Sequence, residues 1–233
     1  MIHYHGTPIT PRSELQKMAG KHFCVSYAEP RDGDWCAANG QSVMWDNGAF
    51  SLHTQGRNVD WSAFQAWAEP RIGHPHWTVV PDVIDGDVDD NLALISKWGL
   101  PRELSAVVWH MAEPIDHLIR LSEMGFGKLC FGSSGKYWQV GSAAWSSRAD
   151  EAWNALEQRG LRPWVHMLRG LALAGDRWPF ASADSVNVAR NFKDGGVCPE
   201  RMARRIDAVQ CPTRWAIAAI QQPLPMFHQD QSR

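Results

Sequence analysis

Short apolar runs alternate with longer amphipathic segments along most of the chain. Eight of these runs are four to seven residues long and mainly apolar, which is typical of strands buried on both faces of a parallel sheet. The predicted strands are residues 2–5, 22–27, 42–46, 77–83, 105–110, 128–131, 163–168 and 182–185.

Residues typical of helix ends lie between the predicted strands. Thr10 followed by Pro11 and Asp60 followed by Trp61 are predicted helix starts, and glycines at 20, 99, 125 and 160 are predicted helix ends. The remaining helices are expected at 88–98, 114–124, 147–158, 199–209 and 214–220.

Eight strands alternating with helices predict a single (β/α)₈ barrel of the TIM type. We expect it to occupy residues 1–220, followed by a polar tail at 221–233. An open, doubly wound sheet is the alternative. However, six predicted strands carry a polar residue at or just past the carboxyl end, and only a barrel brings all such ends to one mouth. These residues are Asp46, Asp82, His110, Ser133, His166 and Asp184.

Composition excludes several classes of protein. Hydrophobic residues make up 44% of the chain and 13 residues are Trp, so a disordered chain is excluded. No apolar run approaches a membrane span and the N-terminus lacks a signal-peptide core, so we expect a cytoplasmic protein without a membrane partner. A net charge of −2 argues against nucleic-acid binding by bulk charge and leaves a local basic groove open. The five cysteines include no CxxC pair, which indicates reduced thiols.

Two acidic segments are candidates for chemistry. Asp46 lies in MWDNGAFS, where the acid either forms a simple turn or places a carboxylate at the mouth, with the N–H groups of Asn47 and Gly48 free for a ligand. Asp82 follows Pro81, which keeps the preceding residue extended and so directs the carboxylate.

Two later segments complete the candidate mouth. Gly132, Ser133 and Ser134 belong to FGSSG, which forms either a plain turn or a set of backbone donors for an oxygen atom. Asp184 lies in an apolar strand, where a carboxylate is costly unless it is paired or functional, and Arg190 follows it as a candidate phosphate or carboxylate ligand.

The histidines support a competing hypothesis. His3, His5, His110, His166 and Asp184 resemble in part the ligands of metal-dependent amidohydrolases. A ligand His is missing where FGSSG stands, and no Lys or Glu is available to bridge two metals at the fourth strand. A non-catalytic barrel that binds a nucleobase is a third alternative.

Four segments in order resemble the tRNA-guanine transglycosylase family. MWDNGAFS is similar to its Asp-Ser-Gly-Gly-Phe turn, TVVPDVIDGD and KLCFGSSG fall where the family places a base-reading acid and a Gly-rich turn, and DSVNVARN resembles its nucleophile segment. In style the chain is similar to the phage and prophage enzymes that insert 7-deazaguanines into DNA.

The resemblance implies a base exchange without a cofactor. Asp184 would be the nucleophile, Asp46 the acid and base, and Asp82 the acceptor for the guanine edge, with FGSSG at the O6 oxygen. His110 stands near the position of a base-reading glutamine, and His166 and Arg190 would complete the substrate site. The implied partners are DNA and a 7-deazaguanine base. The motifs do not distinguish DNA from RNA, nor do they indicate an oligomeric state.

The chain departs from the family's pattern in one respect that can be measured. The tRNA enzymes carry a Cys-rich zinc site after the barrel, whereas Cys198, Cys211 and His228 lack its spacing. We therefore expect purified protein to contain no stoichiometric zinc by elemental analysis. Stoichiometric zinc that is lost when Cys198 or Cys211 is changed to Ala would contradict this prediction.

Overall fold

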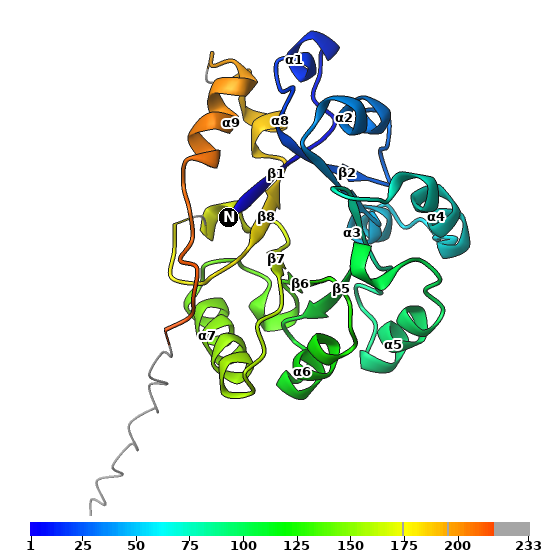
Figure 1. The fold of residues 1–233 in the computed structure, drawn as a ribbon, viewed down its shortest axis with the longest axis vertical. Helices are drawn as coiled ribbons and strands as arrows, with labels where there is room; N and C mark the ends of the chain where they lie inside the picture. Colours follow the sequence, from blue (N-terminus) through cyan, green and yellow to red (C-terminus); the bar gives the residue numbers. More distant parts are fainter. Residues whose placement is uncertain (174, 195, 217–233) are drawn as a thin grey trace, which may run out of the picture.

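The computed structural model describes residues 1–173, 175–194 and 196–216. Eight parallel strands pair in sequence order, and the first pairs with the last, so the sheet closes into a barrel (Figure 1). The strands are β1 Ile2–Gly6, β2 His22–Ser26, β3 Ser42–Asp46, β4 Trp77–Val79, β5 Ser105–His110, β6 Lys128–Gly132, β7 Val165–Met167 and β8 Ser182–Ser185. The predicted (β/α)₈ fold is confirmed.

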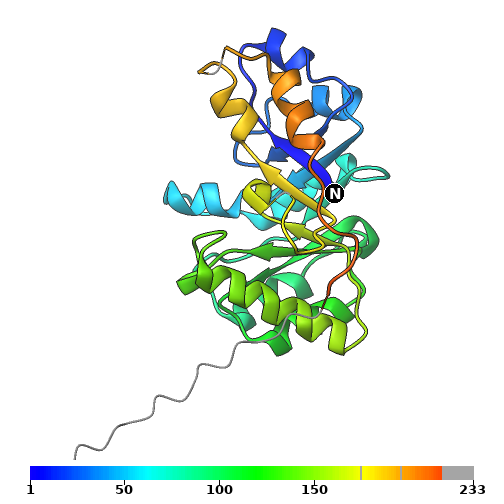
Figure 2. The ribbon, with the colours of Figure 1, turned by 90° about the vertical axis from the view of Figure 1, so that its left-hand side faces the viewer.

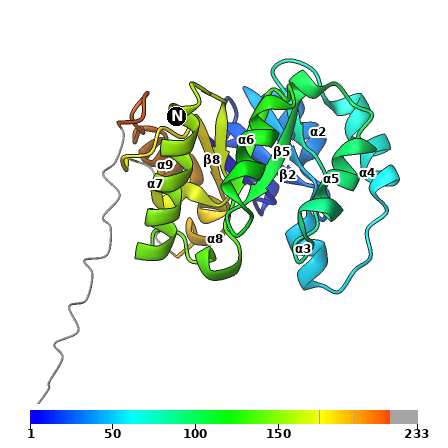
Figure 3. The same ribbon diagram turned by 90° about the horizontal axis from the view of Figure 1, so that it is seen from below.

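Helices surround the barrel on its outer side (Figure 1). Within the described residues the α-helices are α1 Arg12–Gln16, α2 Gly33–Asn39, α3 Ala49–Thr54, α4 Trp61–Ala68, α5 Val88–Ser96, α6 Ile115–Glu123, α7 Ala143–Gln158, α8 Asn187–Asn191 and α9 Pro199–Asp207. Seen from the side, α3 projects away from the N-terminus (Figure 2), and α3 and α8 lie at the end of the barrel opposite the N-terminus (Figure 3). That end carries the carboxyl termini of the strands.

Several helix boundaries differ from the prediction. Asp60 caps α4 as expected, through hydrogen bonds from the N–H groups of Ser62 and Ala63. Helix α1 is shorter than expected and begins after Pro11, without a side-chain cap from Thr10. Helix α7 begins four residues early because the Ser142 hydroxyl caps it.

Helices α2, α3 and α8 were not predicted. Each is only five to seven residues long, too short to display a helical period in sequence. Residues 214–216 are not helical, and the rest of the predicted 214–220 helix and the 221–233 tail lie outside the described residues.

Alternate strand residues fill the inside of the barrel. Tyr4 and Trp77 lie in one buried cluster with side chains from β1 to β6. The Tyr4 hydroxyl accepts hydrogen bonds from Trp77 Nε1 at 2.8 Å and from the Ser42 hydroxyl at 3.1 Å. The Lys128 ammonium lies over the rings of Trp77 and Trp164. These side chains pack the end of the barrel that carries the strand N-termini, so the interior is a core and not a pore.

The outer layer depends on large aromatic side chains. Phe131 points outward from β6 and is fully buried, with ring centroids 5.0 Å from Trp109, 5.8 Å from Trp153 and 5.8 Å from Phe180. Most of the 13 tryptophans likewise lie in or against the hydrophobic clusters, so packing explains them. No helix among the described residues is long and apolar enough to cross a membrane.

This packing predicts a large difference between two phenylalanines. Phe131→Ala should lower the free energy of unfolding by about 3–5 kcal/mol, because it removes a buried ring and leaves a cavity. Phe50→Ala, at a side chain that is 44% exposed, should lower it by about 1 kcal/mol or less. Chemical denaturation of both variants measures the two values, and equal losses would contradict this account of the core.

Candidate functional site

Three carboxylates gather at the C-terminal mouth of the barrel. Asp46 ends β3, Asp82 lies three residues beyond β4, and Asp184 lies in β8. Burial raises the pKa of Asp46 to about 6, and the negative charges of Asp184 and Asp82 contribute to the shift. The same three charges act on the buried thiol of Cys130 and, after burial itself, raise its pKa. The predicted convergence of the acids is therefore present.

Asp184 is held by two donors and keeps 14% of its side-chain exposure. Its Oδ1 accepts a hydrogen bond from the backbone N–H of Arg169 at 2.7 Å and contacts His166 Nε2 at 3.2 Å. His166 is fully buried, and its other ring nitrogen contacts the Ser182 hydroxyl. His166 therefore orients Asp184 and does not reach the mouth as a substrate ligand, which corrects its predicted role.

Asp46 is held by its own turn. Gly48 adopts a left-handed backbone with φ of 74°, and its N–H donates to Asp46 Oδ2 at 3.0 Å. A hydrogen bond with Ser26 also lowers the pKa of Asp46, but burial outweighs it. The prediction that the Gly48 N–H is free for a ligand is therefore wrong, because the carboxylate next to it already occupies this donor.

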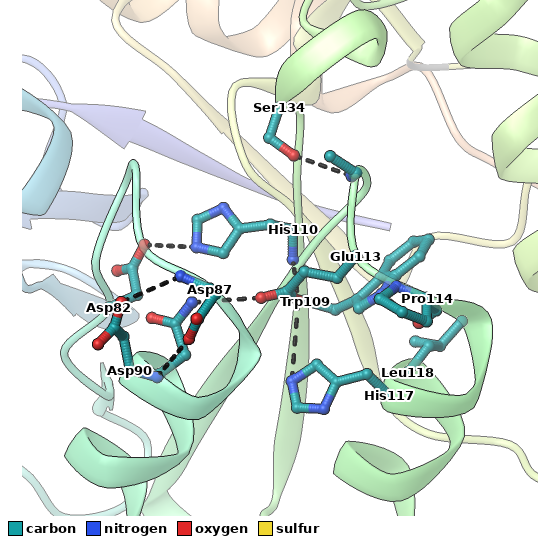
Figure 4. A network of polar contacts seen from close by, with 12 residues as sticks. Asp82, Asp87, Asp90, Trp109, His110, Glu113, Pro114, His117, Leu118 and Ser134 are labelled. Atoms are coloured by element: carbon teal, nitrogen blue, oxygen red, sulfur yellow. Dashed lines mark hydrogen bonds and ion pairs between the residues drawn. The ribbon is translucent and has the colours of Figure 1, made fainter.

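Both carboxylate oxygens of Asp82 have a partner, and the contact with His110 is visible in Figure 4. Asn47 Nδ2 donates to Asp82 Oδ1 at 2.7 Å, and His110 Nε2 lies 3.1 Å from Asp82 Oδ2. Asn47 Nδ2 also donates to the carbonyl oxygen of Val80, and Asn47 Oδ1 accepts from the N–H of Ala49. The side chain of Asn47 is thus fixed by the structure and positions Asp82.

The FGSSG turn is partly structural. The Ser133 hydroxyl accepts a hydrogen bond from Trp145 Nε1, and the Ser134 hydroxyl accepts one from the N–H of Ala112. Gly132 ends β6 directly beside His110, where a Cβ would lie 3.4 Å from the Nδ1 atom of that ring. A side chain at Gly132 would therefore crowd both His110 and Val108.

Arg190 is exposed on α8, and no ion pair of its guanidinium is found within the described residues. Its position after β8 agrees with the sequence prediction, and its charge is available at this end of the molecule. Trp109 is fully buried and is explained by packing, whereas Trp138 is exposed beyond β6.

One contact across the C-terminal mouth of the barrel was not predicted from the sequence. The Arg169 guanidinium lies 3.5 Å from the centre of the exposed Phe50 ring. Arg169 follows β7 and Phe50 follows β3, which are opposite strands of the barrel, so the pair crosses the mouth. Arg169 has a left-handed φ of 58°, which is uncommon for a residue other than glycine and typical of functional positions. No local pattern in the sequence announces a contact between two such distant loops.

The five residues of the histidine hypothesis do not come together. His3 Nε2 contacts the carbonyl oxygen of Val209, and His5 Nε2 contacts Asp207 at 3.0 Å, so both point outward to α9 and the residues after it. His110 and His166 lie inside the barrel, bound to different acids. In the part of the chain that the structure describes, no three His, Cys, Asp or Glu side chains are arranged to hold a metal ion.

The two cysteines that follow the barrel, Cys198 and Cys211, lie in different environments. Cys198 is exposed before α9, whereas Cys211 is buried and contacts Met1 and the carbonyl oxygen of Leu173. His228 lies outside the described residues.

Comparison with known proteins adds no assignment. No protein-family model matches the chain, and no curated protein matches its sequence significantly. The chemistry of the site must therefore be argued from its geometry. Asp46 has a pKa of about 6, which suits a group that gives and takes a proton near neutral pH, whereas Asp184 is oriented by two donors toward the same mouth.

The raised pKa of Asp46 predicts how stability depends on pH. Between its ordinary pKa of 3.8 and about 6, the folded protein binds more protons at this site than the unfolded chain. Stability is therefore lost as the pH rises through this window. At pH 7, Asp46→Asn should raise the free energy of unfolding by roughly 1–3 kcal/mol.

Chemical denaturation over a range of pH measures this difference. It should shrink as the pH falls from about 6 toward about 4. Asp89→Asn, at an exposed acid of α5, is the matched control and should show no such gain. Equal stabilities of wild type and Asp46→Asn at pH 7 would contradict the burial of an unfavourable charge.

Proposed function

We propose that this protein is a base-exchange glycosyltransferase that replaces guanine in DNA with a 7-deazaguanine derivative. The observation that carries the proposal is the pair formed by Asp46 and Asp184. The two acids interact by charge at one mouth, but one has a pKa near neutrality and the other is fixed by hydrogen bonds. Two carboxylates in different environments are the usual requirement for displacement at a sugar carbon with retention.

The first displacement frees guanine. An oxygen of Asp184 attacks C1′ of the flipped nucleotide, and the bond from C1′ to N9 breaks with its electron pair passing to the base. Asp46 gives its proton to the departing base. The product is a glycosyl-aspartate and free guanine.

The second displacement reverses these roles. Asp46 removes the N9 proton of the incoming 7-deazaguanine, and N9 attacks C1′ as the bond to Asp184 breaks. Two inversions restore the original configuration of the sugar. The hydrogen bonds from Arg169 and His166 orient the attacking carboxylate and stabilise it when it leaves.

In this proposal Asp82 accepts hydrogen bonds from the Watson–Crick edge of guanine. Asn47 and His110 fix its direction, and each carboxylate oxygen has a second lone pair for the N1–H and 2-amino groups. The pair of Phe50 and Arg169 at the mouth is a candidate stacking platform for a planar base, since rings and guanidinium groups both stack on aromatic bases.

DNA binding is assigned to basic residues beyond β8. Arg190 and Lys193 follow the proposed nucleophile, and Arg201 and Arg205 share one face of α9. These side chains can contact phosphates while the base enters the barrel. Arg204 is already paired with Glu200 and contributes less.

The division of labour between the acids is testable with two variants. Asp184→Asn should abolish exchange and the covalent DNA adduct, because a carboxamide is a poor nucleophile. Asp46→Asn should lower exchange by roughly 10²–10⁴-fold, because proton transfer is lost, and the loss should be smallest with a base that leaves easily. Incorporation of labelled guanine into DNA and trapping of the adduct measure both effects.

Asp89→Asn serves again as the control and should keep full activity. An adduct with Asp184→Asn but none with Asp46→Asn would reverse the assigned roles. Binding of guanine without any exchange by the wild type would instead favour a barrel that only binds a nucleobase. Full activity of both variants would exclude the transglycosylase mechanism.

A further inference from the structure

The side chain of Arg169 crosses a mouth that is lined by carboxylates, and it pairs with none of them. Its guanidinium lies 3.5 Å from the centre of the Phe50 ring, which follows the opposite strand of the barrel. Among the described residues, no carboxylate, carbonyl or hydroxyl oxygen accepts a hydrogen bond from this guanidinium. Pairing within the described chain therefore does not explain why an arginine stands here.

The backbone of Arg169 makes the presence of an arginine more unusual. A φ of 58° is a conformation that glycine and asparagine adopt far more readily than arginine. The surroundings impose it, because the N–H of Arg169 donates to Asp184 Oδ1 at 2.7 Å and Gly170 packs so closely on Met167 that a Cβ there would overlap it. A long cationic side chain on such a backbone indicates a role for its guanidinium.

The contact with Phe50 leaves the N–H groups of Arg169 available. At 3.5 Å from the ring centre, the guanidinium plane must lie nearly parallel to the ring, because an edge-on group would drive a nitrogen atom into the ring. A guanidinium carries its N–H groups in its own plane, so they point past the ring and not into it. Phe50 therefore fixes the plane of a set of donors that have no acceptor within the described residues.

A phosphate group matches these donors in shape and in charge. A guanidinium binds phosphate oxygens through paired, parallel hydrogen bonds, and it can do so while one of its faces rests on an aromatic ring. The carboxylates of Asp46, Asp82 and Asp184 at the same mouth would repel a phosphodiester. A cation at the mouth offsets this repulsion.

We propose that Arg169 binds a phosphate group next to the sugar that Asp184 attacks, so that its backbone N–H holds the nucleophile and its guanidinium holds the nucleotide. The proposal rests on the proposed function, because that reaction supplies the sugar and its phosphates. It adds a substrate class, since a nucleotide that bears this phosphate is preferred over a free nucleoside. The 5′ and 3′ phosphates of the sugar both have this chemistry, and the experiment has an arm for each.

Binding to the free protein is the first test and needs no catalysis. Calorimetry measures the affinities for deoxyguanosine, its 5′-monophosphate and its 3′-monophosphate. One of the monophosphates should bind roughly 10- to 100-fold more tightly than the nucleoside. Arg169→Asn should abolish this preference and leave the affinity for the nucleoside unchanged, because asparagine tolerates the left-handed backbone and keeps the N–H on Asp184. Arg169→Lys, which keeps the charge without the paired donors, should retain part of the preference.

The matched control is Arg159→Asn. Arg159 is exposed, caps the end of α7 that leads toward β7, and lies away from the mouth. This variant removes the same charge from the protein as Arg169→Asn and should bind all three compounds as the wild type does.

Exchange of labelled guanine into DNA is the second test. A single methylphosphonate, which removes the charge of one phosphate, is placed on the 5′ or the 3′ side of the target guanine. On one side it should lower exchange by the wild type roughly 10- to 100-fold, and exchange by Arg169→Asn by no more than about 2-fold, because the contact is already absent.

A phosphate preference that survives in Arg169→Asn would overturn the proposal, as would a wild type without any preference for a monophosphate. Equal losses of wild type and Arg169→Asn on the methylphosphonate substrates would also overturn it. Failure of the proposed function looks different, because an Arg169-dependent preference for a monophosphate would then remain without any exchange of guanine. If the proposal alone fails, exchange proceeds and does not depend on an interaction between Arg169 and a phosphate.

Discussion

A carboxylate can be kept inside a folded protein only where donors or a bound proton replace the water that it loses. The barrel mouth holds three such groups, and the solutions differ. Asp184 receives a backbone N–H and a histidine, and Asp82 receives an amide and a histidine. Asp46 has the N–H of its own turn and a hydrogen bond with Ser26, and in compensation its pKa rises. The different roles proposed for the acids follow from this unequal supply of donors.

The supply of donors comes from elements that the barrel brings together. His166 and Asp184 are inward residues of adjacent strands, and Asn47 and Asp82 follow adjacent strands as well. Outside the sheet, Phe131 packs among Trp109, Trp153 and Phe180, so β5 and β6 are supported by α7 and by the segment that leads into β8. Rigid support matters because small displacements of a reacting group cost large factors in rate.

The barrel and the gathering of acids could be predicted because both depend on position relative to strand ends. Asp46, Asp82 and Asp184 each lie at or near the carboxyl end of a strand. Closure of the parallel sheet brings these ends together at one mouth. The partners could not be predicted. Glu113 accepts a hydrogen bond from Asn91, and Arg169 lies over Phe50. Both contacts join separate segments of the chain, and nothing in the local sequence specifies which segment is met. Likewise His3 and His5 resemble metal ligands in sequence, but the two-residue period of β1 turns both of them outward.

The packed floor of the barrel, formed around Tyr4, Trp77 and Lys128, has a consequence for the order of events. Because the barrel is closed at the strand N-termini, the departing base and the incoming base must pass through the same opening at the strand C-termini. Arg169 and Phe50 meet across this opening. In the exchange proposed above, the first base has to leave before the second arrives. The covalent adduct must therefore persist while the first base leaves and the second base enters, although water can reach it through the same opening throughout. In the proposed reaction, whatever keeps water away from the sugar during that interval determines whether bases are exchanged or merely removed.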